Sequence, residues 1–247
     1  MKVLELFGRG LARFLSQSSK REIRVATCTP DTLAASIRKG DVLLVEGSSR
    51  FSTVVKYLTQ STWSHAVLCV AEDGSLLEAD VVAGVRRVPL STFADLHTRI
   101  CRPMGLRPDE IDAVVDYALS RVGHQYDLKN IFDLARYLVQ PVFIPMRWRR
   151  RLLALGSGDP TRAICSSLIA QAFHAVHYPI LPESVFSQSR DPDCVNCFDE
   201  LLHIRHHSLF TPRDFDISPY FQIVKPTLDG SFDPHALAWV EEGEGEG

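Results

Sequence analysis

The sequence has no long hydrophobic run and no large excess of charge of one sign. No apolar stretch approaches the roughly 18 residues that a transmembrane helix needs. Glu5, Arg9 and Arg13 interrupt the beginning of the chain, so we recognise no secretory signal peptide there. The formal net charge of −3 gives no reason to expect nucleic acid as a partner. From these absences we expect a cytoplasmic protein.

Motifs for cofactors and metals are also missing. There is no glycine-rich loop of the kind that cradles phosphates and no motif that requires an organic cofactor, so none is expected. Cys194 and Cys197, followed by His203, provide ligand types that suit zinc, but the interval between Cys197 and His203 is too short for a known finger. We therefore expect no metal. Without an export signal, the six cysteines are expected to be free thiols.

The composition is typical of a globular protein, with 45% apolar and 23% charged residues. A length of 247 residues suits one domain with appendages. We divide the chain into a basic amphipathic helix and linker over residues 1–24, a domain over 25–226, and an acidic low-complexity tail over 227–247 that is expected to be disordered. A basic insertion interrupts the domain at about 140–161.

Two basic segments leave alternatives open. Apolar residues recur at helical spacing between Val3 and Leu15, with basic residues around them, which predicts a helix. This helix could dock on the domain core or bind a membrane surface or a partner. The basic insertion around Arg147 to Leu155 could be a lid, a membrane-facing flap or a solvated helix face.

Hydrophobic patterns predict an α+β domain. We expect strands over 41–45, 65–70, 75–79, 84–88, 99–102 and 221–224, and helices over 53–60, 108–122, 128–139 and from Pro212 onward. Because most of the strands follow one another directly, the sheet should be mainly antiparallel.

A cysteine stands at the start of an apolar helix pattern between Ala163 and Phe173. At a helix N-terminus, unpaired backbone N–H groups and the helix dipole favour the thiolate, which is the nucleophilic form. Cys165 is therefore a candidate nucleophile, although a cysteine in an apolar run can also be a small core residue.

A thiolate of this kind needs an imidazole and a group that orients it. His65 opens a predicted strand and could be held rigidly toward the cysteine helix. Glu78 follows on the next strand after a turn, where its carboxylate could fix the imidazole tautomer. Asp80 would lie on the same face of that strand and could take the same role.

The order of His65, Glu78 and Cys165 resembles one family. It is similar to the NlpC-type papain-like cysteine hydrolases in their circularly permuted, YiiX/YebB-like branch, in which the cysteine comes last; lecithin retinol acyltransferase-like enzymes are more distant relatives. The other matching segments are Gly40-Asp41-Val42-Leu43-Leu44, Trp63-Ser64-His65-Ala66-Val67, Leu77-Glu78-Ala79, Gly123-His124-Gln125-Tyr126-Asp127, Thr211-Pro212-Arg213-Asp214-Phe215 and Ser218-Pro219-Tyr220-Phe221. The resemblance extends over residues 37–226.

This resemblance implies a permuted papain-like fold, with a mainly antiparallel sheet packed against helices that include the nucleophile helix. It implies a cysteine hydrolase, an amidase, peptidase or esterase, in which Cys165 attacks the carbonyl, His65 acts as base and then acid, and Glu78 orients His65. Ser64 and the Tyr126 hydroxyl are candidate substrate or oxyanion contacts, because acyl transfer needs a donor there; Tyr126 could equally be a buried aromatic.

The substrate is expected to be a small peptide- or lipid-linked molecule. The basic segments favour a lipid or acylated substrate and peripheral contact with the inner membrane surface. Two alternatives remain open: a lipid acyltransferase, and a non-catalytic peptide- or lipid-binding module on the same fold.

Overall fold

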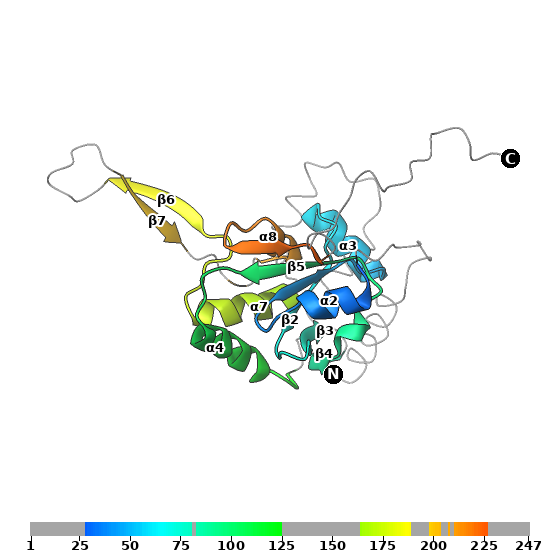
Figure 1. The fold of residues 1–247 in the computed structure, drawn as a ribbon. Helices are drawn as coiled ribbons and strands as arrows, with labels where there is room; N and C mark the ends of the chain where they lie inside the picture. Colours follow the sequence, from blue (N-terminus) through cyan, green and yellow to red (C-terminus); the bar gives the residue numbers. More distant parts are fainter. Residues whose placement is uncertain are drawn as a thin grey trace, which may run out of the picture.

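Six antiparallel strands form the central sheet of the protein (Figure 1). The computed structural model describes residues 28–80, 83–124, 164–188, 198–203, 207 and 210–226. The strands are β1 (Val42–Val45), β2 (His65–Cys69), β3 (Leu76–Asp80), β4 (Gly84–Val88), β5 (Thr98–Pro103) and β8 (Phe221–Val224), and their order across the sheet is β4-β3-β2-β1-β5-β8. The predicted α+β class and antiparallel pairing are confirmed.

Both faces of the sheet are covered, which explains why its central strands are apolar on both sides. Alternate residues such as Leu44 and Leu68 pack with helices α4 (Pro108–Leu119) and α7 (Ile164–Ala175), which lie side by side. The intervening residues, such as Leu43 and Val67, pack under α2 (Pro30–Ser36) and the segment around Phe93, which follows the short 3-10 helix η1 (Leu90–Thr92).

Local capping explains where several helices begin. In α4, the Glu110 side chain accepts a hydrogen bond from the Arg107 N–H at 2.9 Å. In α8 (Pro212–Asp216), the Asp214 carboxylate accepts one from the Thr211 N–H at 2.7 Å. Each helix has proline in its first turn, where no N–H is needed. Helix α3 (Arg50–Thr59) begins after Ser49, earlier than the predicted start at residue 53.

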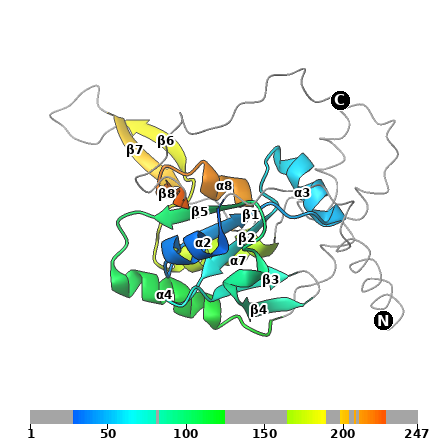
Figure 2. The same cartoon turned by 45° about the vertical axis from the view of Figure 1, so that its right-hand side comes forward.

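Besides the short η1, the sequence patterns did not predict α2 or one hairpin. The hairpin consists of β6 (Glu183–Gln188) and β7 (Phe198–His203) and forms a separate two-stranded sheet. Figures 1 and 2 show this hairpin projecting away from the six-stranded sheet. Cys194 and Cys197 lie between the two strands in the sequence, outside the described residues.

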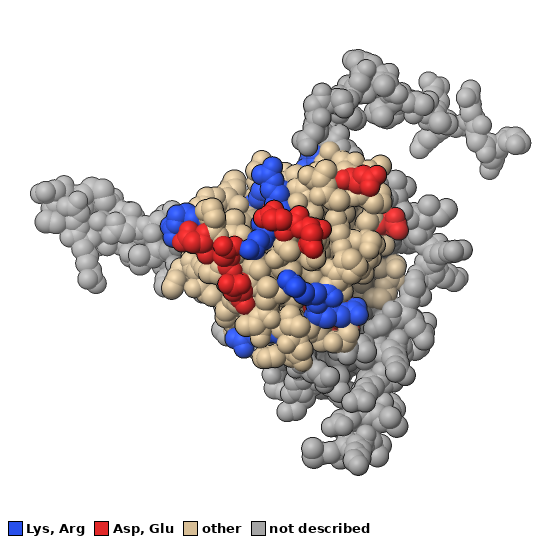
Figure 3. Space-filling model, turned by 60° about the horizontal axis from the view of Figure 1, so that its bottom comes forward, with Lys and Arg blue, Asp and Glu red and all other residues tan. Residues whose placement is uncertain are grey.

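Several expected features lie outside the described residues: the N-terminal helix, the helix over 128–139, the basic insertion and the acidic tail. Within the described part of the chain, no helix is long and apolar enough to cross a membrane. On the face shown in Figure 3, basic and acidic side chains are interspersed and form no large patch of one sign.

Candidate active site

Cys165 is the second residue of α7, and its side chain points into the core beside the sheet. The residue is only 5% exposed and packs with Ala66 of β2 and Ala79 of β3 in one apolar cluster. The first N–H groups of a helix have no partner within the helix. The sulfur therefore lies where backbone N–H groups and the helix dipole favour negative charge.

The sulfur lies where β2 and β3 separate. The ladder between these strands pairs Leu68 with Leu77 and Cys69 with Leu76, and its register continued would pair Ala66 with Ala79. Instead, the Ala66 N–H donates a hydrogen bond to the Cys165 sulfur. A hydrogen bond to a thiolate favours the ionised form, so the end of the ladder helps to hold the nucleophile and its charge.

His65 is the first residue of β2 and lies at the same end of the sheet. Its ring forms a hydrogen bond with Cys165. The His65 ring also packs near the Phe93 ring, with 5.9 Å between the two ring centroids. The structure thus brings together the two residues that the sequence suggested as nucleophile and base.

Cys165 and His65 each change the pKa of the other. Burial raises the pKa of Cys165, but the charge and hydrogen bond of His65, together with the Ala66 N–H and the Ser166 hydroxyl, lower this pKa more, so it lies below the usual thiol value. Burial lowers the pKa of His65, but Cys165 and the carboxylates of Glu78 and Asp80 raise it above its usual value. Each shift therefore favours the charged form of its group, the thiolate of Cys165 and the imidazolium of His65, more than in an isolated thiol or imidazole.

The other three described cysteines behave in the opposite way. All are free thiols. Burial raises the pKa of Cys28, raises that of Cys69 to about 12, and raises that of Cys101 further still. Among the four cysteines in the described ranges, Cys165 is thus the one whose surroundings favour the thiolate.

Glu78 and Asp80 both act on His65 from β3. Glu78 is 5% exposed, and its Oε1 accepts a hydrogen bond from Arg86 Nη2 at 2.9 Å. Asp80 accepts one from the Ala83 N–H at 2.7 Å, at the turn after β3. Both carboxylates raise the pKa of His65 through their charge, with Glu78 the stronger. A direct hydrogen bond from His65 to Glu78 stays a prediction.

Ser64, the first candidate oxyanion contact, is 2% exposed and bonded to the backbone. Its hydroxyl accepts a hydrogen bond from the Gly47 N–H at 2.8 Å and donates to the Val45 carbonyl at 3.4 Å. A Cβ at residue 47 would meet the Ser52 Oγ and lie 3.0 Å from the Ser64 Oγ, so a larger residue there would have to displace the Ser52 hydroxyl. These contacts hold the loop after β1 against the start of β2, and the oxyanion role of Ser64 stays a prediction.

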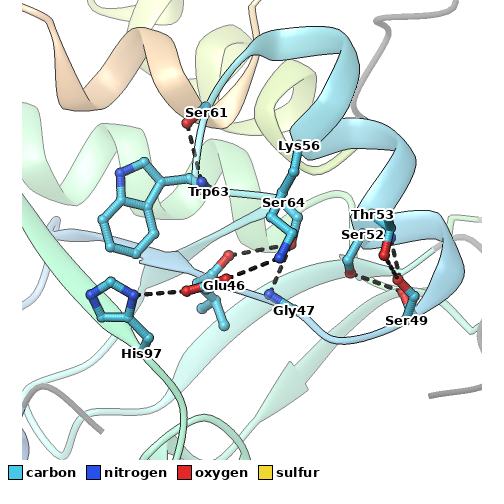
Figure 4. Close-up of polar contacts among 11 residues, drawn as sticks. Glu46, Gly47, Ser49, Ser52, Thr53, Lys56, Ser61, Trp63, Ser64 and His97 are labelled. Carbon is cyan, nitrogen blue, oxygen red and sulfur yellow. Dashed lines mark hydrogen bonds and ion pairs between the residues drawn. The ribbon is translucent and has the colours of Figure 1, made fainter. Parts of the chain in front are cut away.

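A polar cluster surrounds Glu46, which precedes Gly47 in this loop, as Figure 4 shows. The Glu46 carboxylate binds Lys56 Nζ at 2.9 Å through one oxygen and His97 Nδ1 at 2.9 Å through the other. The His97 ring lies 5.0 Å from the Trp63 ring, and the Trp63 indole N–H donates to Asp216 at 3.0 Å. Trp63 precedes Ser64 and His65 directly, so this cluster fixes the chain just before the candidate base.

The remaining predicted sites lie elsewhere. Tyr126, Cys194 and Cys197 are outside the described residues, and of His203 the structure describes only the backbone in β7. In the described ranges there is no group of three or more His, Cys, Asp or Glu side chains that could hold a metal ion.

A comparison with known protein families finds a match over part of this chain. Residues 36–138 match the family described as permuted papain-like amidase enzymes, YaeF/YiiX, of the C92 family. The predicted resemblance to the permuted YiiX branch is confirmed. The matched stretch contains His65 and Glu78, whereas Cys165 lies beyond it.

A crystal structure described as the metalloprotein yiiX from Escherichia coli O157:H7 is also similar to this chain. The two chains are 15% identical, and the match covers 76% of this chain and 97% of the other at a TM-score of 0.46. A comparison with curated proteins finds no match.

Sequence reasoning missed three groups around the pair. Ser166, whose hydroxyl lies 3.9 Å from the Cys165 sulfur, follows the cysteine directly and could have been noticed from that position. The Ala66 N–H carries no side-chain signal. Arg86 becomes visible only once the register of β3 and β4, which places it opposite Glu78, is known.

Proposed function

We propose that the protein is a cysteine hydrolase that cleaves an amide or ester bond through a thioester intermediate. The observation that carries this proposal is the hydrogen-bonded Cys165–His65 pair at the start of α7, with a lowered pKa for the thiol and a raised pKa for the imidazole. Such a pair supplies a nucleophile and a proton donor at once. The family match to amidase enzymes supports the same reaction class.

In this mechanism the Cys165 thiolate attacks the substrate carbonyl carbon and forms a tetrahedral intermediate. The negative oxygen is stabilised by the backbone N–H of Cys165 at the start of the helix and, as predicted from the sequence, by Tyr126. The His65 imidazolium then donates its proton to the leaving amine or alcohol as the C–N or C–O bond breaks. A thioester on Cys165 and a neutral imidazole remain.

Water completes the reaction. His65 accepts a proton from the attacking water, the thioester C–S bond breaks, and the acid product leaves while the thiolate and imidazolium form again. Glu78 supports the imidazolium in both steps through its negative charge. If a lipid amine or alcohol takes the place of water, the same site acts as an acyltransferase.

The substrate class rests on the sequence. The amphipathic helix predicted between Val3 and Leu15 and the basic sequence from Arg147 to Arg151 favour a lipid-linked or acylated substrate at an anionic membrane surface. Peptide-linked substrates in solution are the alternative.

The decisive experiment looks for the covalent intermediate. The purified protein is mixed with a panel of acyl amides and esters, including lipid-linked and peptide-linked members, and its mass is followed by rapid quenching. We expect an acyl adduct on the Cys165 peptide that hydroxylamine removes, and product release that Cys165→Ser and His65→Gln abolish. Transfer to an added amine in preference to water would assign an acyltransferase.

Substrate binding without any adduct, and without turnover in the wild-type protein, would refute catalysis and favour the binding module. Cys28→Ser is the matched control, because burial raises the pKa of that thiol and it lies outside the pair. It should leave both the adduct and the turnover unchanged.

A further inference from the structure

We propose that Arg86 is a positioning residue for the Cys165–His65 pair, and that it acts by holding the Glu78 carboxylate in place. This inference rests on the proposed function only for the roles of Cys165 and His65. Arg86 acts through Glu78 and not by contact with the sulfur or the imidazole.

The sheet register provides the geometry. β3 and β4 pair so that Glu78 lies directly opposite Arg86, and Arg86 Nη2 donates to Glu78 Oε1 at 2.9 Å. Directly opposite residues of an antiparallel pair lie on the same face. Alternate residues of a strand share a face, so His65 lies on the face of Val67 and Glu78 on the face of Leu76, and Val67 and Leu76 pack in one cluster.

Burial makes this contact necessary. The Glu78 side chain is 6% exposed, whereas that of Arg86 is 51% exposed and reaches it from the edge strand. A buried polar group needs a hydrogen-bond partner, and that partner also fixes its position. Arg86 thus holds the Glu78 carboxylate where its charge favours the imidazolium form of His65.

The charged and titratable groups around His65 come from three strands and one helix. His65 of β2 meets Cys165 from α7 and the charges of Glu78 and Asp80 from β3. Arg86 of β4 interacts with Glu78 through a hydrogen bond and charge, and with Asp80 through charge. Removing Arg86 thus has two opposite effects on His65: a positive charge is lost nearby, and Glu78 loses the partner that holds its carboxylate in place. The second effect should dominate, because the charge of Glu78, and not that of Arg86, is among the main influences on the pKa of His65.

The test needs no substrate. The rate of Cys165 alkylation by iodoacetamide is measured against pH, with the labelled site assigned by mass spectrometry; the midpoint reports formation of the thiolate in the coupled pair. Arg86→Met should raise this midpoint by about 1 unit, the scale expected when a nearby charge is lost. Glu78→Gln should raise it by a similar amount.

Two further variants separate the mechanism from a loss of stability. Because Arg86 acts through Glu78, the double variant of Arg86→Met with Glu78→Gln should match Glu78→Gln alone. Arg86→Lys keeps the charge and should restore most of the wild-type midpoint, even if Arg86→Met folds poorly. Arg87→Met is the matched control on the same strand, since Arg87 is exposed and pairs across the strands with Leu77; it should change nothing.

The outcomes are distinct. An unchanged midpoint in Arg86→Met, or additive shifts in the double variant, would overturn the role of Arg86 while the Cys165–His65 pair and the proposed function remain. A wild-type midpoint at the usual thiol value would instead refute the ion pair, and with it the proposed function.

Discussion

Cys165 should be the most reactive of the described thiols, and replacing His65 with glutamine should make it as unreactive as the others. The charge and hydrogen bond of His65 are the largest influences that lower the pKa of Cys165. Without them, the desolvation that accompanies burial in the core is the dominant influence left, and it raises the pKa. Glutamine keeps a hydrogen-bonding side chain of similar size but carries no charge.

Cys69 gives the scale of the effect. Its pKa of about 12 corresponds to a thiolate fraction of about 10⁻⁵ at pH 7. A thiol at the usual pKa of about 8.5 has a fraction of about 3%. Because the pKa of Cys165 lies below the usual value, its thiolate fraction should exceed that of Cys69 by more than about a thousandfold.

The assay follows iodoacetamide labelling of each cysteine peptide at pH 7. Rates are normalised to those of the unfolded chain, where all the thiols are equally accessible. In the wild-type protein, labelling of Cys165 should persist as the pH falls below the usual thiol pKa and disappear as the pH falls through its own lowered pKa. His65→Gln should slow it by at least about a hundredfold at pH 7. Equal rates for Cys165 and Cys69 in the wild-type protein, or no effect of His65→Gln, would refute this account.

Four other outcomes follow from the structure and the sequence. The free energy of unfolding should fall at acid pH as Cys165, whose pKa is lowered, takes up a proton, and at alkaline pH as His65, whose pKa is raised, loses one. Urea titrations over a pH series measure this dependence, and Cys165→Ala should make it flatter on both sides. Asp41→Ala should lower that free energy by about 2–4 kcal/mol in the same titrations, because Asp41 is 1% exposed and its removal leaves a partly buried guanidinium without its partner. Liposome co-sedimentation should require anionic lipid, weaken with salt and drop on removal of residues 1–20, while Cys165→Ala leaves it intact; binding that ignores all three changes would return soluble peptides to first place as substrates. Elemental analysis should find no stoichiometric zinc, and zinc that is lost in Cys194→Ser would contradict this.

The strands of the sheet could be predicted because their composition is unambiguous. The run from His65 is rich in β-forming apolar residues and bounded by turn residues, and it forms β2 as expected. Helix α2 could also have been found, since Thr29 followed by Pro30 and Asp31 is a typical helix start, and the Thr29 hydroxyl does accept from the Thr32 N–H.

Other features depend on information that a single sequence does not contain. The juxtaposition of Cys165 and His65 was expected from their order and family resemblance, but no local pattern specifies that the sulfur meets the Ala66 N–H. That contact depends on where β2 and β3 stop pairing. The partner of Glu78 likewise depends on the length and register of the hairpin, and a shift of one residue would have put Arg87 opposite Glu78 on the outer strand.

A sulfur atom that completes a strand's hydrogen bonding turns the backbone into a reporter of the chemistry. The Ala66 amide proton has the nucleophile itself as its acceptor. Its NMR chemical shift should therefore follow the ionisation of Cys165, and a thioester, in which the sulfur is a much poorer acceptor, should release this proton to exchange with solvent. The Ala66 amide should thus report the thiolate and thioester states of Cys165 without a label on the substrate.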